Sequence, residues 1–270
     1  MLIAQLSDSH IAGPGKKAYS VAPTAENLAR CVDHINRNSP SVDMVLITGD
    51  ITYSGDMEEV ELAARLLDRL QCPFYIVPGN HDLRSTLWTV FGGRACPEMN
   101  DGFFNYVVEG KDIRLIALDS TVPGEPGGEI CSIRARWLDE KLGEKSRQPT
   151  LLFMHHPPMK FGVLETDEDG FAGSGLLGEV LDNYSNILRI LCGHIHLASH
   201  GGWRGKIVTT APGMGLQLGL DLTLTRLSEF FLEPPGYLLH YFTPDHNLVT
   251  YTVTVKDMDG PYLFEGRQNQ

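Results

Sequence analysis

The order of apolar segments in this sequence predicts an α/β fold. Short β-rich runs recur along the chain, and between several of them apolar residues return at helical spacing. Strand and helix therefore alternate, which is typical of sheets covered by helices. The chain has 270 residues, 42% of them hydrophobic, which is enough for one full core. We expect one α/β domain with room for a small appendage.

The predicted strands are runs rich in Val, Ile, Leu and Phe, the composition of buried strands. They span residues 2–6, 44–48, 74–77, 113–118, 151–154, 187–191 and 207–210. Near the end of the chain, residues 237–243 and 248–255 flank a Pro-Asp-His-Asn turn, which predicts a β-hairpin.

Helices are predicted where apolar residues fall at the i, i+3, i+4, i+7 spacing of one buried face. Thr24 can cap the first helix. Its buried face is Leu28, Cys31, Val32 and Ile35, and that of the second is Val60, Ala63, Ala64 and Leu67. The third spans 134–145 with Ile133, Trp137, Leu138 and Leu142 inward, and the fourth spans 176–184.

Two segments fit no regular element. Residues 160–174 are acidic and rich in glycine, and we expect either a mobile lid or a solvated surface loop. Between 216 and 224 every second residue is leucine, which gives one apolar face. Such a face most often belongs to the core. It could also form a pocket wall, and a protruding interface element would equally fit the Phe230–Phe231 pair that follows.

Composition limits the function classes. Against 34 Asp and Glu stand 22 Lys and Arg, a net charge of −12, which argues against binding nucleic acid through its phosphates. Five cysteines without a CxxC motif indicate neither a disulfide framework nor a zinc ribbon, so we expect a cytoplasmic protein. The apolar runs are far shorter than the ~20 residues of a membrane span, so no membrane association is expected.

Polar residues of the metal-binding types follow five predicted strands directly. The blocks are Asp8-Ser9-His10, Gly49-Asp50, Gly79-Asn80-His81-Asp82, His155-His156-Pro157-Pro158 and Gly193-His194-Ile195-His196. Because sites in open α/β sheets assemble at the carboxyl ends of strands, these blocks should converge. Their mixture of nitrogen and oxygen donors suits Zn, Fe, Mn or Co.

The spacing within the blocks has a physical meaning. If the backbone is extended, Asp8 and His10 point the same way, as do His194 and His196. Glycine before a ligand permits a tight turn or a close approach. The Asp50 carboxylate has two oxygens and can bridge two ions ~3.5–4 Å apart, the separation in two-metal hydrolytic sites.

Taken together in this order, the five blocks resemble those of the calcineurin-like metallophosphoesterases. The similarity is strongest to the class III branch, which contains cyclic nucleotide phosphodiesterases and bacterial glycerophosphodiesterases. It runs from Asp8 to His196 without a missing block. The resemblance implies a four-layered α/β/β/α sandwich with a small C-terminal cap that builds oligomers. The catalytic domain would be 1–196 with 236–256, and the cap and oligomerisation segment 197–235 with 257–270.

The resemblance also implies roles for single residues. Two divalent ions would be bound, one by Asp8, His10 and His196 and the other by Asn80, His155 and His194, with Asp50 as the bridge. The catalytic residues would be His81, Asp50 and Asn80, and of these Asn80 and His81 would also contact the substrate. His81 would stabilise the phosphate or protonate the leaving oxygen. Asp82 would orient its loop, and His156 would lie behind the ligands or in the pocket.

The implied reaction is hydrolysis of a small phosphodiester by in-line attack of a metal-bound hydroxide. The substrate could be a 3′,5′-cyclic nucleotide or a glycerophosphodiester, and the residues do not choose between these or among the metals. The implied partner is a second copy of the chain, bound through the cap. Two alternatives are a phosphomonoesterase of the same superfamily and a non-catalytic protein-binding scaffold, although a scaffold would be expected to have lost some ligands.

Overall fold

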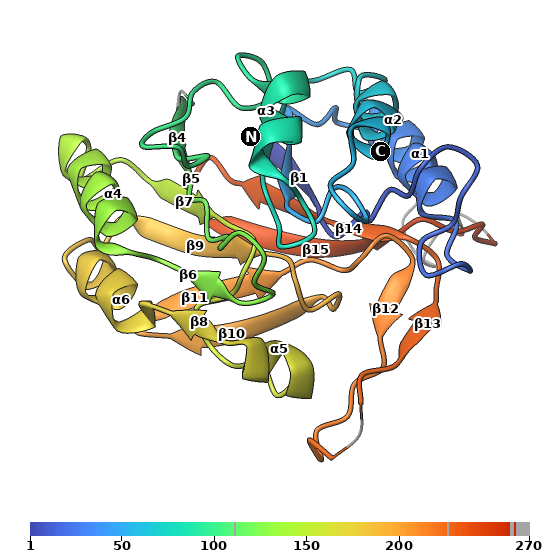
Figure 1. The fold of residues 1–270 in the computed structure, drawn as a ribbon. Coiled ribbons are helices and arrows are strands. Elements are labelled where there is room, and N and C mark those ends of the chain that lie inside the picture. Colours follow the sequence, from blue (N-terminus) through green and yellow to red (C-terminus); the bar gives the residue numbers. More distant parts are fainter. Residues whose placement is uncertain (111, 226, 260–261, 263–270) are drawn as a thin grey trace, which may run out of the picture.

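A computed structural model describes residues 1–110, 112–225, 227–259 and 262. Two sheets form its centre and helices cover their outer faces (Figure 1). The first sheet has the strand order β15 (Leu248–Thr254), β14 (Gly236–Phe242), β1 (Leu2–Leu6), β2 (Met44–Thr48) and β3 (Phe74–Val77). Strands β1, β2 and β3 are parallel, and the β14–β15 hairpin joins antiparallel to β1.

The second sheet has six strands. Their order is β10 (Ser199–Trp203), β11 (Lys206–Thr210), β9 (Ile187–Cys192), β7 (Thr150–Phe153), β5 (Arg114–Ala117) and β4 (Tyr106–Glu109). The inner four strands are parallel, and β4 and β10 are antiparallel edges.

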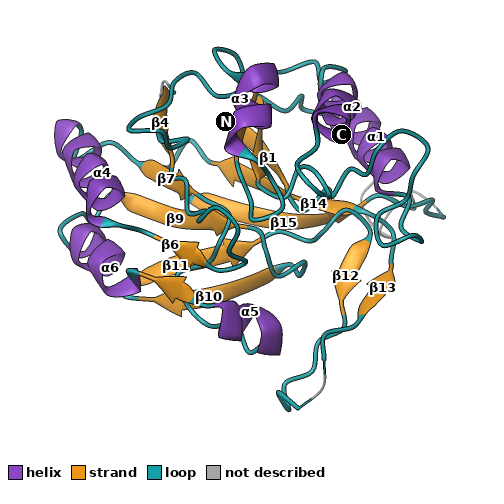
Figure 2. Ribbon diagram, in the orientation of Figure 1, coloured by secondary structure: helices purple, strands orange, loops and turns teal. Residues whose placement is uncertain are grey.

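Helices α1 (Thr24–Asn36), α2 (Met57–Leu67) and α3 (Arg84–Phe91) cover the first sheet, whereas α4 (Ser132–Glu144) and α6 (Ser174–Asp182) cover the second (Figures 1 and 2). Alternation along β5 proves the layering: Leu115 and Ala117 belong to the core shared with the first sheet, and Ile116 packs with the residues of α4 and α6. The predicted α/β/β/α sandwich is therefore confirmed.

Most predicted elements lie within two residues of the observed ones, but the expectations for Thr24 and Ile133 were wrong. Thr24 does not cap α1 but is its first residue, and its hydroxyl donates to the carbonyl of His10 at 3.0 Å. Ile133 is 45% exposed rather than buried, because α4 begins at Ser132 and turns Ile133 outward, while Arg134 takes the buried position.

The 160–174 segment is more regular than a loop. It contains a short helix, α5 (Leu164–Asp169), and β8 (Phe171–Ala172), which pairs with β6 (Gly128–Glu129). Within the described part of the chain, no helix is long and apolar enough to span a bilayer.

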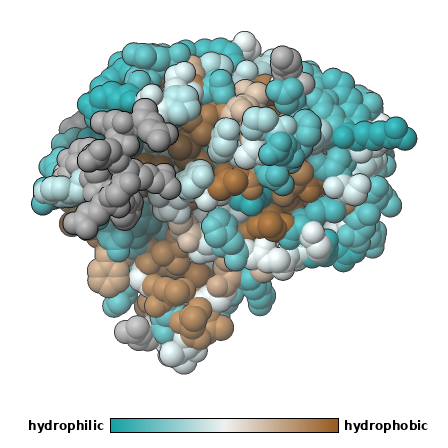
Figure 3. Space-filling view, turned by 180° about the vertical axis from the view of Figure 1, so that it is seen from behind, coloured by the Kyte–Doolittle hydropathy of each residue, from teal (hydrophilic) through white to brown (hydrophobic). Residues whose placement is uncertain are grey.

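The leucine-rich segment projects from the body instead of entering the core. Strands β12 (Leu216–Leu218) and β13 (Phe230–Leu232) form an antiparallel ribbon that carries residues 219–225 and 227–229 outward (Figure 1). We call residues 216–232 the arm, of which residue 226 is not described. The expectation of a core strand was wrong beyond Leu218, since these arm residues are exposed: Leu220, Leu222, Leu224, Leu227, Phe230, Phe231 and Leu232. Figure 3 shows the resulting apolar surface at the lower end of the molecule.

Candidate metal centre

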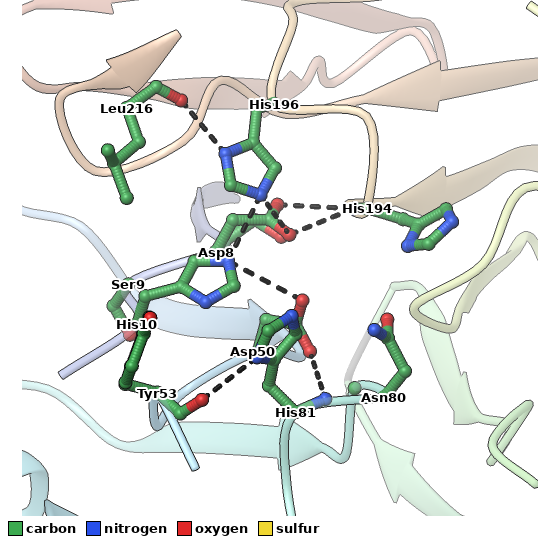
Figure 4. Close-up of polar contacts among 12 residues, drawn as sticks. Asp8, Ser9, His10, Asp50, Tyr53, Asn80, His81, His194, His196 and Leu216 are labelled. Atoms are coloured by element: carbon green, nitrogen blue, oxygen red, sulfur yellow. Dashed lines mark hydrogen bonds and ion pairs between the residues drawn. The ribbon is translucent and has the colours of Figure 1, made fainter. Parts of the chain in front are cut away.

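All five polar blocks meet at the carboxyl ends of β1, β2 and β3 in one sheet and of β7 and β9 in the other. The predicted side chains are close to one another (Figure 4). Nε2 of His10 lies 3.0 Å from Nε2 of His196, which is 3.6 Å from a carboxylate oxygen of Asp8. Nε2 of His155 lies 3.0 Å from Oδ1 of Asn80.

The carboxylate of Asp50 lies between two sets of donors. Its Oδ2 is 3.5 Å from Nε2 of His10 and 3.5 Å from Nε2 of His155. Its Oδ1 accepts a hydrogen bond from the backbone N–H of His81 at 2.9 Å. One oxygen is thus within reach of both sets, as a bridging ligand has to be.

Two groups of side chains could each hold a metal ion. The ligand atoms of each group lie within 4.8 Å of one another. One group is Asp8, His10, Asp50 and His196, and the other is His155, His156 and His194. His156 is the weakest candidate, because its Nε2 donates to the carbonyl of Pro126 and its Nδ1 faces the hydroxyl of Ser120 at 2.9 Å. Both of its ring nitrogens are therefore engaged.

Backbone carbonyls set the orientation of the other imidazoles. Nδ1 of His155 donates to the carbonyl of Thr48 at 2.7 Å, and Nδ1 of His196 donates to the carbonyl of Leu216 at 2.9 Å. With Nδ1 protonated, Nε2 presents its lone pair to the centre, as in many metal-binding histidines. Buried Nε2 of His194 has no hydrogen-bond partner among the described residues.

The electrostatics of the centre favour cations. Asp8 and Asp50 are buried carboxylates, and the ion pairs that they make are with histidines. Burial raises the pKa of Asp8; it would also raise that of Asp50, but His155 and His10 outweigh it and hold the Asp50 pKa well below its usual value. Buried carboxylates need positive charge beside them, and divalent ions would supply it to both Asp8 and Asp50.

The pKa values of three proposed ligand histidines are shifted in different directions. Burial lowers the pKa of His194 to about 3 and that of His10 well below its usual value, so both rings are neutral donors. Burial also acts to lower the pKa of His155, but Asp50 raises it to about 9. A cation between His155 and Asp50 would compete with that proton, because histidine binds metals only in its neutral form.

The backbone at the centre is strained. Positive φ angles of 39° to 73° occur at five of the predicted ligands: Asp8, His10, Asp50, His194 and His196. Each such conformation costs about 1–3 kcal/mol for a residue with a side chain. The expectation that these pairs share an extended backbone was therefore wrong, since each ligand sits on a left-handed turn after its strand.

The glycines at Gly79 and Gly193 are explained by close approach. A Cβ at Gly79 would collide with the backbone and carboxylate of Asp50, and one at Gly193 would collide with the hydroxyl of Ser7. Both positions admit only glycine, because the ligand loops cross there at contact distance.

His81 and Asp82 have distinct surroundings. Nδ1 of His81 donates to the carbonyl of Tyr53 at 2.9 Å, which leaves Nε2 available to a ligand. The Asp82 carboxylate accepts hydrogen bonds from the backbone N–H groups of Ile51, Thr52 and Gly79 at 2.9 to 3.0 Å. Asp82 thus holds two ligand-bearing loops together, as predicted. The side chain of His81 hydrogen bonds to Tyr53 rather than to Asp82.

A pocket of about 370 Å³ opens over the centre. His10, Asp50, Asn80, His81, His194 and His196 line it. Its mouth is formed by α5 and the arm, which contribute Glu165, Asp169, Glu229 and Phe230. Among the described lining residues there is no lysine or arginine, so the mouth is negatively charged.

Several pocket residues were not predicted from the sequence. Tyr19 stacks edge-on against Tyr53 at 5.1 Å and lies 5.4 Å from Phe230, which forms an aromatic wall beside His10. Tyr19 lies in an irregular segment without a motif, and nothing local marks it. The carbonyl of Leu216 orients His196, but a carbonyl has no sequence signal at all.

This fold and this cluster of side chains define a metallophosphoesterase. Residues 1–198 match the Calcineurin-like phosphoesterase family, and the chain belongs to that family. The predicted family is therefore confirmed.

Individual relatives narrow the class. The chain is 36% identical to the "Probable glycerophosphodiester phosphodiesterase GpdQ" of Arcobacter nitrofigilis, over 100% of this chain and 99% of that protein. It is 26% identical to the 3′,5′-cyclic adenosine monophosphate phosphodiesterase CpdA of Escherichia coli K12, over 80% of this chain and 76% of that protein. These names agree with the predicted reaction class, a phosphoric diester hydrolase.

The fold is shared with a dimetal phosphatase from Danio rerio. The TM-score is 0.68 at 16% identity, and the match covers 95% of this chain and 99% of that one. At this identity the likeness concerns the fold alone.

Proposed function

We propose that this chain is a phosphodiesterase that uses two divalent metal ions to hydrolyse glycerophosphodiesters. The observation that carries the proposal is the convergence of six other ligand-type side chains around the Asp50 carboxylate, beneath one pocket. Similarity along the whole chain to a protein named as a glycerophosphodiester phosphodiesterase supports the same substrate class.

The donor set fits two ions. Asp8, His10 and His196 would hold one, Asn80, His155 and His194 the other, and Asp50 would bridge them. The unpartnered Nε2 of His194 and the buried carboxylates support this assignment. Fe, Mn, Zn and Co all suit such a mixture of donors. When bound, such ions neutralise the phosphate and lower the pKa of a coordinated water.

His81 and Asn80 would act on the substrate. Because Nδ1 of His81 donates to the carbonyl of Tyr53, a second proton on the ring would sit on Nε2, from which it can be donated to a phosphate oxygen or passed to the leaving alkoxide. Asn80 lines the same pocket, where its amide can contact the phosphate as well as an ion. Asp50 would hold this loop through the N–H of His81.

The charge of the pocket mouth favours a diester over a monoester. Glu165, Asp169 and Glu229 repel negative charge, and a monoester dianion carries more of it than a diester. A neutral glycerol or a positively charged ethanolamine group would meet no such penalty. The activities that compete with this proposal are those of a phosphomonoesterase and of a cyclic nucleotide phosphodiesterase.

The arm is our proposed cap. Strands β10 and β11 of the predicted cap segment belong to the six-stranded sheet, so we restrict the proposed cap to residues 216–232. Its exposed leucines and phenylalanines form an apolar surface of the kind that binds another protein surface, and we assign it to contact between copies of the chain. The C-terminal part of the predicted cap lies mostly outside the described residues. The five free cysteines support a reducing, cytoplasmic setting.

The proposed activity is tested by metal restoration. Protein stripped with a chelator is assayed on glycerophosphoethanolamine, cyclic AMP, bis-p-nitrophenyl phosphate and p-nitrophenyl phosphate, before and after addition of Mn²⁺, Zn²⁺, Fe²⁺ or Co²⁺. We expect metal to restore diester cleavage, with glycerophosphoethanolamine cleaved faster than cyclic AMP. The reverse order would favour the cyclic nucleotide activity, and preference for the monoester would refute a diesterase.

A pair of matched variants controls for general effects of charge removal. Asp50→Asn keeps the shape of the bridging side chain but removes its charge, and it should abolish metal-restored activity. Asp245→Asn makes the same change on the exposed turn between β14 and β15 and should leave activity unchanged. No turnover by the wild type with any metal, despite two bound ions, would favour the scaffold alternative.

A further inference from the structure

A chain of hydrogen-bonded polar side chains runs between the two sheets behind the metal centre. Gln5 on β1 and His240 on β14 are each 0% exposed, and they lie on neighbouring strands of the first sheet. Nε2 of His240 lies 3.0 Å from Oε1 of Gln5, and Nδ1 lies 2.8 Å from the hydroxyl of Thr250 on β15. Arg189 of the second sheet completes the chain through a hydrogen bond to Thr250.

Each hydrogen bond in this chain has only one possible direction. The carbonyl of Cys192 can only accept, so the Gln5 amide turns its NH₂ group toward Cys192 and its Oε1 toward His240. Burial, with Arg189 and His200 nearby, lowers the pKa of His240 to about 3, so the ring is neutral and Nε2–H donates to Oε1 of Gln5. Nδ1 of that ring then accepts from the Thr250 hydroxyl, and the Gln5 amide is held with its NH₂ group toward the other sheet.

That NH₂ group joins the ends of two ligand-bearing strands. It donates to the hydroxyl of Thr48, the last residue of β2, at 3.0 Å, and to the carbonyl of Cys192, the last residue of β9, at 2.8 Å. The carbonyl of Thr48 orients His155. Cys192 directly precedes Gly193 and His194. One amide thus connects the ends of β2 and β9, which belong to opposite sheets and support the proposed ligands His155 and His194.

Stability alone does not explain this arrangement. Replacing a satisfied buried polar pair by apolar groups of the same shape is often neutral or stabilising. A polar pair does, however, fix one spacing and one rotation, which an apolar contact between the sheets would leave variable. The chain of hydrogen bonds therefore specifies geometry at the strand ends.

We propose that Gln5 and His240 are positioning residues that set the distance between the ends of β2 and β9, and so the affinity of the ion held by His155 and His194. This inference rests on the proposed function only in requiring that two ions bind. It concerns residues that lie outside the ligand blocks and touch neither ion nor substrate.

The test measures metal binding. Titration calorimetry with Mn²⁺ alone is performed on the wild type, on Gln5→Met, which keeps the length of the side chain but cannot hydrogen bond, and on His240→Phe. We expect one of the two ions to bind ~10–100-fold more weakly to Gln5→Met, the usual effect of removing a group that supports a metal ligand. The other ion should bind as in the wild type.

Two further variants separate positioning from general destabilisation. Tyr106→Phe removes another fully buried hydrogen bond, the one to the carbonyl of Ile76, and should leave both affinities unchanged. His240→Gln keeps a donor for Gln5 and should bind Mn²⁺ nearly as the wild type does, while His240→Phe should resemble Gln5→Met. If Gln5→Met does not fold, the contrast between His240→Phe and His240→Gln decides the question.

The outcomes are distinct. Wild-type affinities in both Gln5→Met and His240→Phe would overturn this inference and leave the proposed function intact. Equal weakening of both ions, matched by Tyr106→Phe, would also overturn it. A wild type that binds no ions would overturn the proposed function, and this inference with it.

Discussion

His81 offers the sharpest test of the proposed chemistry. Among the described residues its side chain makes one hydrogen bond, from Nδ1 to the carbonyl of Tyr53, and its ring contacts His10 edge-on at 4.6 Å between centroids. His81→Ala should therefore cost only about 1 kcal/mol of unfolding free energy. None of the ligand side chains loses a hydrogen bond from this change, so both ions should remain bound.

The effect on turnover should be much larger than the effect on stability. A positioned general acid contributes ~10²–10⁴-fold to rate. Because His81 is partly exposed, water can replace it in part, and we expect the lower end of that range. A loss of ~10²-fold in kcat corresponds to about 3 kcal/mol of transition-state stabilisation.

The assay compares two leaving groups. Glycerophosphoethanolamine releases an alkoxide, which needs a proton, whereas bis-p-nitrophenyl phosphate releases a stable phenolate, which does not. We expect His81→Ala to slow the first reaction ~10²-fold and the second far less, with two ions bound in both proteins. His81→Gln, which can donate a hydrogen bond but transfers no proton, should be as slow as His81→Ala on the first substrate.

Equal slowing on both substrates would refute the role of His81 as an acid and leave only stabilisation of the phosphate. Recovery of rate in His81→Gln would point the same way. Loss of a metal ion from His81→Ala would show that His81 supports metal binding, contrary to the role proposed for it.

The remaining predictions concern the second ion, the buried histidine and the arm. Asn80→Ala should lose one of two ions and most turnover while its circular dichroism stays unchanged; two ions with normal turnover, by elemental analysis and assay, would contradict the ligand assignment. His240 is neutral in the folded protein and protonated below pH ~6.5 in the unfolded chain, so its contribution makes stability fall as the pH drops from 6.5 toward its folded pKa of about 3. Between pH 7.5 and 5 we expect denaturant unfolding to show a loss of about 2 kcal/mol from this group that His240→Gln lacks; identical pH profiles would argue against it. Leu222 is 69% exposed on the arm, so Leu222→Ser should leave the fold intact and shift light scattering toward the monomer, and an unchanged mass would remove the arm as the contact.

The sequence alone determined the chemistry of the candidate site and the class of the fold. Strand ends are visible in sequence because buried strands are continuous apolar runs. The residues after them, such as Asp8, Asp50 and His194, are of metal-binding types that rarely follow strands five times in order by chance. Parallel strands bring such ends to one edge, so the convergence could be predicted without coordinates.

The tertiary structure decided what depends on contacts between distant segments. The carbonyls that orient His155 and His196 come from Thr48 and Leu216, and any residue type supplies a carbonyl. The left-handed turns at the ligands are imposed by the crossing loops, whereas local spacing indicated extended backbone.

The arm and the buried chain behind the centre show the same division. Leucine at every second position indicates that one face of the arm is apolar. Only the fold shows that this face points away from the core. Periodicity in the sequence carries no information about what covers a face. Gln5 and His240 are 235 residues apart and follow no motif. Their pairing exists only because β1 and β14 are neighbours in one sheet, and its reach to Cys192 exists only because the second sheet packs against the first.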